Sequence, residues 1–467
     1  MQPLLAIAGL TWKSAFRFRL FLVLAVLLLA SVIGLPLLIQ DDGTARGFTQ
    51  ILLTYTLSVI TGLLGLSTLW LACGTLARDI EECQMQVLCT KPVARWQIWL
   101  GKWLGIMSLN FVLLALAGGS VYALLEYRAG KLPAAEQQVL RSEVLVARGS
   151  AMEASHDADI DAETDKAMQA QLKSNLSEKT DLAGVVNLAE VRKQIREQVL
   201  ASYQIVPPGY TRQWQIDLGH PKSYFQDQPL QLRIKFNTAS KSASGTYFGA
   251  FQAGDPNTTN FWQSELMSLA PDTFHEFAIP ANLCDAQGRL SIVFLNRNDV
   301  ALLFPLDEGM AVLYPEGGFA LNFARGLGII LCWMALLAAL GLTAASFLSF
   351  PVAAFFSLAM LLVGLSSGTL ADAVDSGSVA AGNEETGVAG HSGLDVVLIP
   401  AFKAMLTVIG LAENYSPIDA LSTGRSIPWH ELGGAFLQID LLLGGAIALA
   451  GIFLFGRREL ATAQGTQ

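Results

Sequence analysis

Charged residues are scarce in this sequence. Asp, Glu, Lys and Arg make up 15% of the 467 residues, whereas hydrophobic residues make up 52%. Because soluble domains carry about 25% charged residues, the composition indicates an integral membrane protein. A basic surplus is also lacking, since the formal net charge is −9. Nucleic-acid binding needs a basic stripe, so a nucleic-acid partner is not expected.

The sequence also contains few cysteines. Of the five cysteines, Cys73 and Cys332 lie in apolar runs, Cys83 and Cys89 lie in one polar stretch, and Cys284 stands alone. This distribution predicts no disulfide framework. No histidine or second cysteine pair accompanies Cys83 and Cys89, so we expect no metal site there.

Motifs for nucleotide binding and catalysis are missing as well. The Gly-Lys pairs at 101–102 and 130–131 are followed by Trp and Leu, not by the Ser or Thr of a phosphate-binding loop. The acidic run His156–Asp161 has Ala at 162 and Met at 168, where a calcium loop needs Gly and an acid. We therefore expect a solvated helix start or loop there, and neither enzyme activity nor a cofactor in this chain.

Long apolar runs are the main feature of the sequence. At about 20 apolar residues per span, we predict six membrane helices, over Leu20–Leu38, Thr49–Leu76, Trp99–Leu125, Phe323–Ala345, Val352–Leu370 and Gly433–Phe455. Lys13, Arg17 and Arg19 precede the first run without an acidic residue, which favours a cytoplasmic N-terminus. The run is too long for a typical signal peptide, and no clear cleavage site follows it. Leu5–Trp12 is expected to form an elbow helix in the interface.

Residues 128–316 contain no run of membrane length and are expected to form an extracytoplasmic α+β domain between helices three and four. Residues 128–202 are rich in Ala, Glu, Gln and Lys, which favours helices. Residues 203–316 contain alternating patterns such as Leu230–Phe236, which predict a β-sandwich. The fold class is thus an α-helical membrane protein, with helices one to three in 1–127 and helices four to six in 317–467.

Residues 372–432 interrupt the last group of helices. Ser376–Gly393 is rich in Gly, Ser and Ala, which is typical of a flexible loop. Leu394–Leu411 is apolar but includes Asp395, Pro400 and Lys403. Because charges are costly at membrane depth, we predict an interfacial or re-entrant segment there, with a cytoplasmic C-terminus.

A polar hinge, residues 77–98, joins the second and third predicted spans. Its first half has helical spacing, because Ile80, Cys83 and Val87 fall on one face. This predicts a short helix on the membrane surface that carries Asp79, Glu81 and Glu82. Proline removes a backbone donor, so Pro92 should end this helix.

Three tryptophans follow the hinge. Trp96, Trp99 and Trp103 recur at i, i+3 and i+7, which places the indoles on one face. Such rings prefer the headgroup level of a membrane. We predict that they anchor the third helix at the interface.

One acidic residue falls inside the last predicted span. Asp440 lies about seven residues into it, and an ionisable group at that depth is a functional candidate. Arg325, near the outer start of the fourth helix, is its possible partner. An ion pair that only packs the helices is the alternative interpretation.

The stretch from Ala77 to Lys102 resembles the first cytoplasmic loop of the type-2 ABC export permease family. Members carry an acidic residue, then Lys-Pro-Val-x-Arg and Leu-Gly-Lys. The matching residues are Asp79 or Glu81, Lys91, Pro92, Val93, Arg95, Leu100, Gly101 and Lys102. The resemblance implies that this loop is a coupling helix that fits a groove on an ATP-hydrolysing subunit.

The resemblance also implies the rest of the assembly. The chain would be the permease subunit of an ABC transporter, in the cytoplasmic membrane with both termini inside. A partner ATP-binding subunit would hold ATP and Mg²⁺, and a second permease copy or homologue would complete the transporter. The resemblance implies transport in the direction of export. A membrane-anchored sensor and an envelope-organising protein are the alternatives, each of which would bind through the outer β-sandwich.

Overall fold

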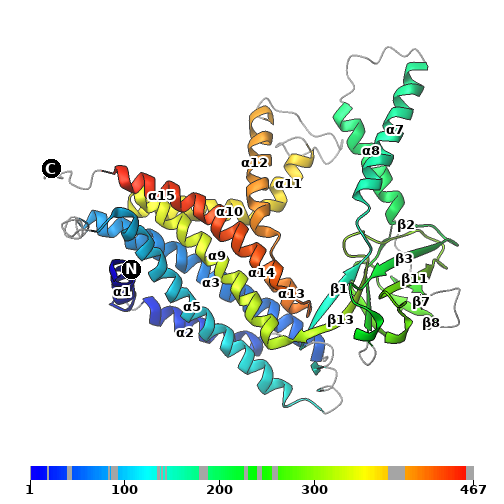
Figure 1. Cartoon of the computed structure of the whole chain (residues 1–467), viewed down its shortest axis with the longest axis horizontal. Helices are drawn as coiled ribbons and strands as arrows, with labels where there is room; N and C mark the ends of the chain where they lie inside the picture. Colours follow the sequence, from blue (N-terminus) through cyan, green and yellow to red (C-terminus); the bar gives the residue numbers. More distant parts are fainter. Residues whose placement is uncertain are drawn as a thin grey trace. The chain divides into compact units, whose positions relative to one another are not determined.

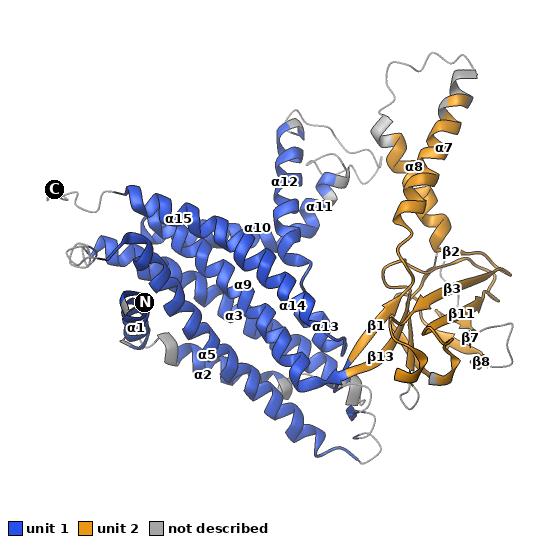
Figure 2. Ribbon diagram, viewed as in Figure 1, with its two compact units in different colours: residues 1–147, 317–467 blue, residues 148–316 orange. Residues whose placement is uncertain are grey.

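The structure is a computed structural model in which the chain forms two compact units, Met1–Ala147 with Gly317–Gln467, and Arg148–Glu316 (Figures 1 and 2). We call them the helical unit and the β unit. The predicted combination of a helical region with a separate domain that contains β-sheet is thus confirmed. The structure describes residues 2–17, 20–38, 45–82, 85, 93–133, 137, 140–141, 145–177, 188–225, 230–238, 245–254, 261–376 and 395–458.

The helical unit is organised around one long helix, α9 (Phe319–Phe347), which packs against α3, α5, α10 and α15 (Figure 1). Alanine and glycine line much of its buried surface, which lets neighbouring backbones approach closely. Within the described residues, the other helices of this unit are α1 (Gln2–Arg17), α2 (Leu20–Leu38), α3 (Ala45–Glu81), α5 (Arg95–Ala129), α10 (Phe350–Leu365), α11 (Ser367–Ser376), α12 (Asp395–Glu413), α13 (Pro417–Ser422), α14 (Trp429–Ala435), the π-helix η4 (Phe436–Gly444) and α15 (Gly445–Arg457).

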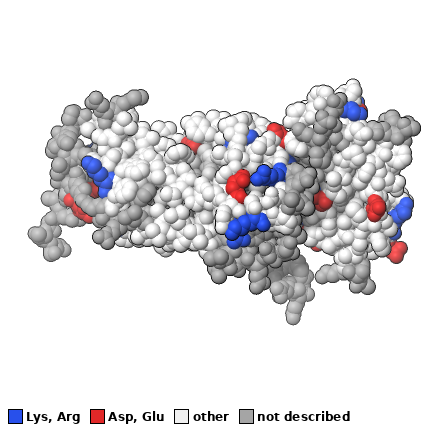
Figure 3. Space-filling model, turned by 90° about the horizontal axis from the view of Figure 1, so that it is seen from below, with Lys and Arg blue, Asp and Glu red and all other residues white. Residues whose placement is uncertain are grey.

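Several of these helices suit a membrane. Among the described residues, five segments are long and apolar enough to cross one, namely Thr49–Glu81, Arg95–Ala129, Phe319–Phe347, Val397–Ser422 and Trp429–Arg457. In the face shown in Figure 3, charged side chains are few and gather in small groups, with broad areas of uncharged side chains between them. Both observations indicate a membrane-embedded protein. The arrangement with six spans stays a prediction.

The structure differs from the sequence-based expectation after α9. The predicted helix Val352–Leu370 breaks at Ser366, so that α10 has 16 residues. At 1.5 Å per residue α10 is about 24 Å long, shorter than the roughly 30 Å of a bilayer core. The segment predicted to be interfacial or re-entrant forms α12, a continuous helix through Pro400, and Val397–Ser422 is among the segments apolar enough to span a membrane. Its side chains from Val397 onward are not buried in this chain.

The β unit contains two four-stranded sheets with orders β1-β13-β4-β10 and β3-β11-β7-β8. A three-stranded sheet β2-β12-β5 and the pair β6-β9 complete the described strands. The strands are β1 (Val146–Met152), β2 (Ile205–Val206), β3 (Thr211–Asp217), β4 (Leu230–Ile234), β5 (Asn237–Thr238), β6 (Tyr247–Gly249), β7 (Phe251–Gly254), β8 (Phe261–Gln263), β9 (Met267–Leu269), β10 (His275–Ile279), β11 (Arg289–Leu295), β12 (Leu302–Leu303) and β13 (Met310–Gly318).

The apolar positions of the predicted alternating strands form one core. Trp214 of β3, Leu232 of β4 and Ile292 of β11 are all buried in it. The outward positions of β4 were expected to be exposed, but Gln231 and Arg233 are buried too. The reason is a polar cluster, in which the buried Arg148 of β1 donates to Gln231 and, at 2.8 Å, to Glu276 of β10.

The described residues of the predicted helical part, 128–202, include both helices and a strand. Helices α7 (Asp157–Ser177) and α8 (Leu188–Gln204) lie in it, and the acidic run at 157–161 opens α7, as a solvated helix start would. Residues 146–152, however, form β1. Ala129 and Leu140 pack together within the helical unit, so the domain begins at residue 148 rather than 128.

Close packing in the helical unit depends on glycine at Gly341 of α9. A Cβ atom there would lie 2.7 Å from the Cβ of Ala72 on α3. We therefore expect Gly341→Leu to separate α3 from α9 and to lower stability by at least about 2 kcal/mol, measured as the thermal unfolding midpoint in detergent. Gly364→Leu is the matched control, since nothing lies within 4 Å of a Cβ at that glycine of α10. Equal midpoints for the two variants would contradict this packing.

Candidate functional site

Most of the predicted hinge residues that the structure describes lie at one end of the helical unit, where α3 ends and α5 begins. We call this the hinge end (Figure 1). The predicted surface helix does not start at Asp79, because α3 continues without a break to Glu81. No glycine or proline interrupts this stretch, so the spanning helix simply extends by about a turn. Lys91 and Pro92 lie outside the described residues.

An ion pair joins α3 to α5 at the hinge end. The Lys102 Nζ atom donates to Asp79 Oδ2 at 2.5 Å and to the carbonyl oxygen of Thr75 at 2.8 Å. The Lys102 side chain is only 8% exposed, whereas that of Asp79 is 33% exposed. Because a buried ammonium needs a partner, this pair fixes the two helices at their adjoining ends.

Glu81 holds the start of α10. Its Oε1 atom accepts a hydrogen bond of 2.9 Å from the backbone nitrogen of Phe350. The first backbone N–H groups of a helix lack partners within the helix, and a carboxylate there also suits the helix dipole. Arg78 lies one turn away from Glu81 on α3, with its guanidinium 4.5 Å from the centre of the Phe350 ring.

Arg95 holds the end of α15. Its Nη1 atom donates to the carbonyl oxygens of Phe455, Gly456 and Arg458 at 3.0, 2.8 and 2.8 Å. The last carbonyls of a helix lack intrahelical donors, and a cation at this end is favourable. Arg95 is therefore a helix cap that acts across about 360 residues of sequence.

Arg458 completes the arrangement, and it is not among the sequence-predicted site residues. Its Nη1 atom donates to the carbonyl oxygens of Ala345 and Ser346 at 3.4 and 3.1 Å, at the end of α9. Charged side chains thus tie the ends of α3, α5, α9, α10 and α15 to one another. The only sequence signal for Arg458 was a basic residue just after an apolar run.

The three tryptophans have three different environments. Trp96 is 46% exposed, as an interface anchor should be. Trp99 is fully buried, and Trp103 donates from Nε1 to the carbonyl oxygen of Ala335 on α9 at 3.1 Å. The anchor prediction is wrong for Trp99, because its face of α5 packs within the protein.

Gly101 is a contact point for α1. A Cβ atom at Gly101 would lie 2.8 Å from the Cβ of Ile7, so only glycine lets α1 and α5 approach this closely. Glu82 is exposed, as Glu81 is, and directly follows α3. Glu82 takes part in none of the helix-end contacts described above.

The predicted partnership of Arg325 and Asp440 does not form, although the structure describes both residues. Arg325 donates from Nη1 to the carbonyl oxygen of Ile427, and its guanidinium lies 5.2 Å from the centre of the Trp429 ring. Asn322, one turn earlier on α9, accepts from the Ile427 nitrogen at 2.7 Å. Arg325 therefore holds the segment before α14.

Asp440 lies in the π-helix η4, a conformation that often marks functional positions. Its carboxyl group lies against the thiol of Cys332, and its Oδ1 atom is buried without a hydrogen-bond partner. An unpaired buried oxygen is costly. Asp440 therefore stays a functional candidate, with Cys332 in place of Arg325 as its neighbour.

Within the described ranges, no group of three or more His, Cys, Asp or Glu side chains could hold a metal ion. No protein-family model, curated protein or solved structure matches this chain. The site is therefore interpreted from its own geometry.

The ion pair of the hinge end predicts that removing Asp79 lowers stability more than removing Lys102. Asp79→Asn leaves a buried ammonium without its carboxylate, and we expect a loss of about 2 kcal/mol, below the 3–5 of a fully buried pair because Asp79 is a third exposed. Lys102→Met should cost less, and the double variant should be more stable than Asp79→Asn alone. Thermal unfolding in detergent measures this, with Lys131→Met at the other end of α5 as the control. Additive effects would show that the pair does not couple the helices.

Proposed function

We propose that this chain is the membrane-spanning subunit of an ABC transporter of the type-2 export permease kind. A separate subunit would bind ATP and Mg²⁺ and would dock at the hinge end from the cytoplasm. A second copy of the chain, or a similar permease, would form the other half of the transporter. The motif resemblance of residues 77–102 supports this family, and the helical unit supplies the membrane region.

The observation that carries the proposal is the set of charged contacts at the hinge end. Asp79 pairs with Lys102, Glu81 caps α10, Arg95 caps α15, and Arg458 caps α9. A force applied to the chain between Glu81 and Arg95 therefore reaches five helices through direct polar contacts. A coupling loop needs such connections, because a push on an isolated loop would be lost in local bending.

This arrangement changes the role of the predicted coupling residues. In this proposal Asp79, Lys102, Glu81 and Arg95 transmit movement within the chain, because each already bonds to another helix. Docking would then use exposed residues at the hinge end that make none of these four contacts, and Glu82 is an acidic candidate. The resemblance thus identifies the region, and the contacts divide its residues between transmission and docking.

Orientation can be tested by cysteine labelling in a chain that has Cys83 and Cys89 replaced by Ser. The native Cys73, Cys284 and Cys332 are buried, and burial raises the pKa of Cys284 to about 11, so it stays protonated and unreactive at pH 8. We expect an impermeant maleimide to label Gln215→Cys in the β unit of intact cells. It should label Trp96→Cys only after permeabilisation. The reverse pattern would overturn the proposed orientation.

Docking can be tested with a charge reversal at Glu82. The tagged chain should co-purify an ATPase from its native membranes, and Glu82→Lys should reduce that ATPase activity about fivefold, as expected for a loss of roughly 1 kcal/mol. The matched control is Glu126→Lys, an exposed acid at the opposite end of α5. Unchanged thermal unfolding of both variants would show that they are folded.

Two results would contradict the proposal. The first is a chain purified in mild detergent without any associated ATPase. The second is an equal loss of ATPase for Glu82→Lys and Glu126→Lys, which would indicate a general effect of charge rather than a docking site.

A further inference from the structure

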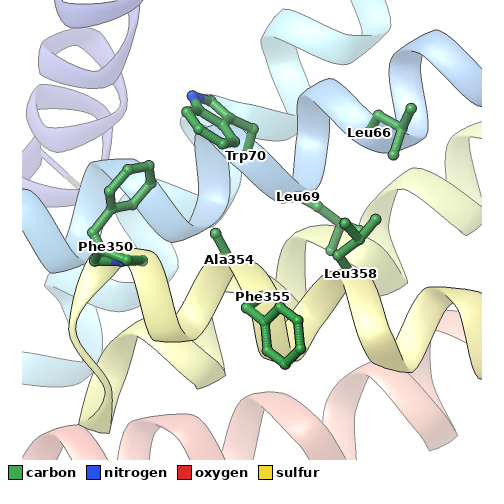
Figure 4. Close-up of a pocket in the computed structure, with 8 residues that line it drawn as sticks. Leu66, Leu69, Trp70, Phe350, Ala354, Phe355 and Leu358 are labelled. Carbon is green, nitrogen blue, oxygen red and sulfur yellow. The ribbon is translucent and has the colours of Figure 1, made fainter.

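An open apolar groove lies between α3 and α10, with a volume of about 440 Å³ (Figure 4). Figure 4 shows Ala354 near its middle, where the short side chain leaves the space unfilled. Phe355 and Leu66 are 74% and 50% exposed, respectively. The lining residues are Leu66, Leu69, Trp70, Phe350, Pro351, Ala354, Phe355 and Leu358. The groove therefore offers an elongated apolar surface and no polar side chain except the indole.

A cationic side chain, Arg78, lies near the end of the groove formed by Phe350. The Phe350 ring packs edge-on against Trp70, with 5.1 Å between ring centroids. The Arg78 guanidinium lies over the same ring at 4.5 Å. Trp70 and Arg78 are eight residues apart on α3, about 12 Å along the helix axis. A single ligand could thus contact the groove with its apolar part and Arg78 with an anionic group.

The location of the groove identifies the ligand. α3 is long and apolar enough to span a membrane, so we expect its exposed surface around Trp70 to face lipid. Arg78, Asp79 and Glu81 lie in its last turns, where a spanning helix reaches the headgroups. A guanidinium stacked by its face on a ring keeps its N–H groups in plane to donate, and it binds phosphate in a forked geometry.

We propose that this groove binds one anionic phospholipid, with an acyl chain along Ala354 and the phosphate at Arg78. The lipid contacts α3 and α10 together, beside the Phe350 nitrogen that Glu81 holds. It therefore stabilises the junction of these two helices at the hinge end. The proposal does not require the ATPase partner, since it concerns this chain in a membrane.

Native mass spectrometry tests the proposal on the purified full chain. The chain is delipidated, reconstituted with equal amounts of dioleoyl phosphatidylglycerol and dioleoyl phosphatidylcholine, and re-extracted in mild detergent. We expect one lipid retained per chain, with phosphatidylglycerol preferred about fivefold, as one basic side chain near the headgroups would produce. Arg78→Gln should abolish the preference but keep a retained lipid. Ala354→Phe should fill the groove and remove the retained lipid.

Matched variants separate this site from general lipid contact. Arg457→Gln removes a guanidinium that lies 4.2 Å over the Phe453 ring of α15, away from the groove, and should keep the preference. Val352→Phe places the same aromatic side chain at an exposed position of α10 that does not line the groove, and should keep the lipid. Each variant is checked by thermal unfolding.

Three outcomes would overturn the proposal. They are equal retention of both lipids by the unaltered chain, retention that survives Ala354→Phe, and loss of preference in Arg457→Gln equal to that in Arg78→Gln. If Phe355→Cys instead cross-links two chains in vesicles and no lipid is retained, a second copy of the chain covers the groove.

Discussion

Backbone groups at helix ends need partners, and this requirement organises the hinge end. The terminal N–H and C=O groups of a helix are unpaired, and an unpaired polar group in apolar surroundings costs several kcal/mol. This chain has few charged residues, yet it uses Glu81, Arg95 and Arg458 for these positions. Because each partner belongs to a different helix, satisfying the ends also joins the helices.

Because these few charged residues bind helix ends, their capacity to contact another protein is limited. A guanidinium whose Nη1 atom donates to three carbonyls at the end of α15 is held in place by that helix end, and a second protein could reach only its other N–H groups. The family-like motif is therefore better explained as two sets of residues. One set, which includes Arg95 and Lys102, links helices inside the chain. The other, which includes Glu82, lies on the surface. A residue that links helices, such as Arg95, could bind another protein with the same N–H groups only if its hydrogen bonds to the helix end were first broken.

The hydrophobic pattern of the sequence correctly predicted elements that depend on residues close together in the chain. The period-two alternation of Leu230–Ile234 gave a strand, and the bounds of α2 agree with the apolar run Leu20–Leu38. The wrong predictions concern residues whose structure depends on contacts with parts of the chain that are distant in sequence. β1 is a strand because it pairs in a sheet with β13, and Trp99 is buried because its face of α5 meets other helices. The capping role of Arg95 depends on carbonyls about 360 residues away, which no spacing rule connects to it.

Phe350 is the point at which these features meet. Its nitrogen is bound by Glu81, and its ring contacts both Arg78 and Trp70 of the same helix. Residues 70, 78 and 81 lie on one face of α3, since they are separated by eight and eleven residues. Any rotation of α3 that moves Asp79 against Lys102 must also move this face against α10. The apolar groove and the hinge end thus share α3 and Phe350, so a lipid bound in the groove, as proposed, would be coupled to movement of the hinge end.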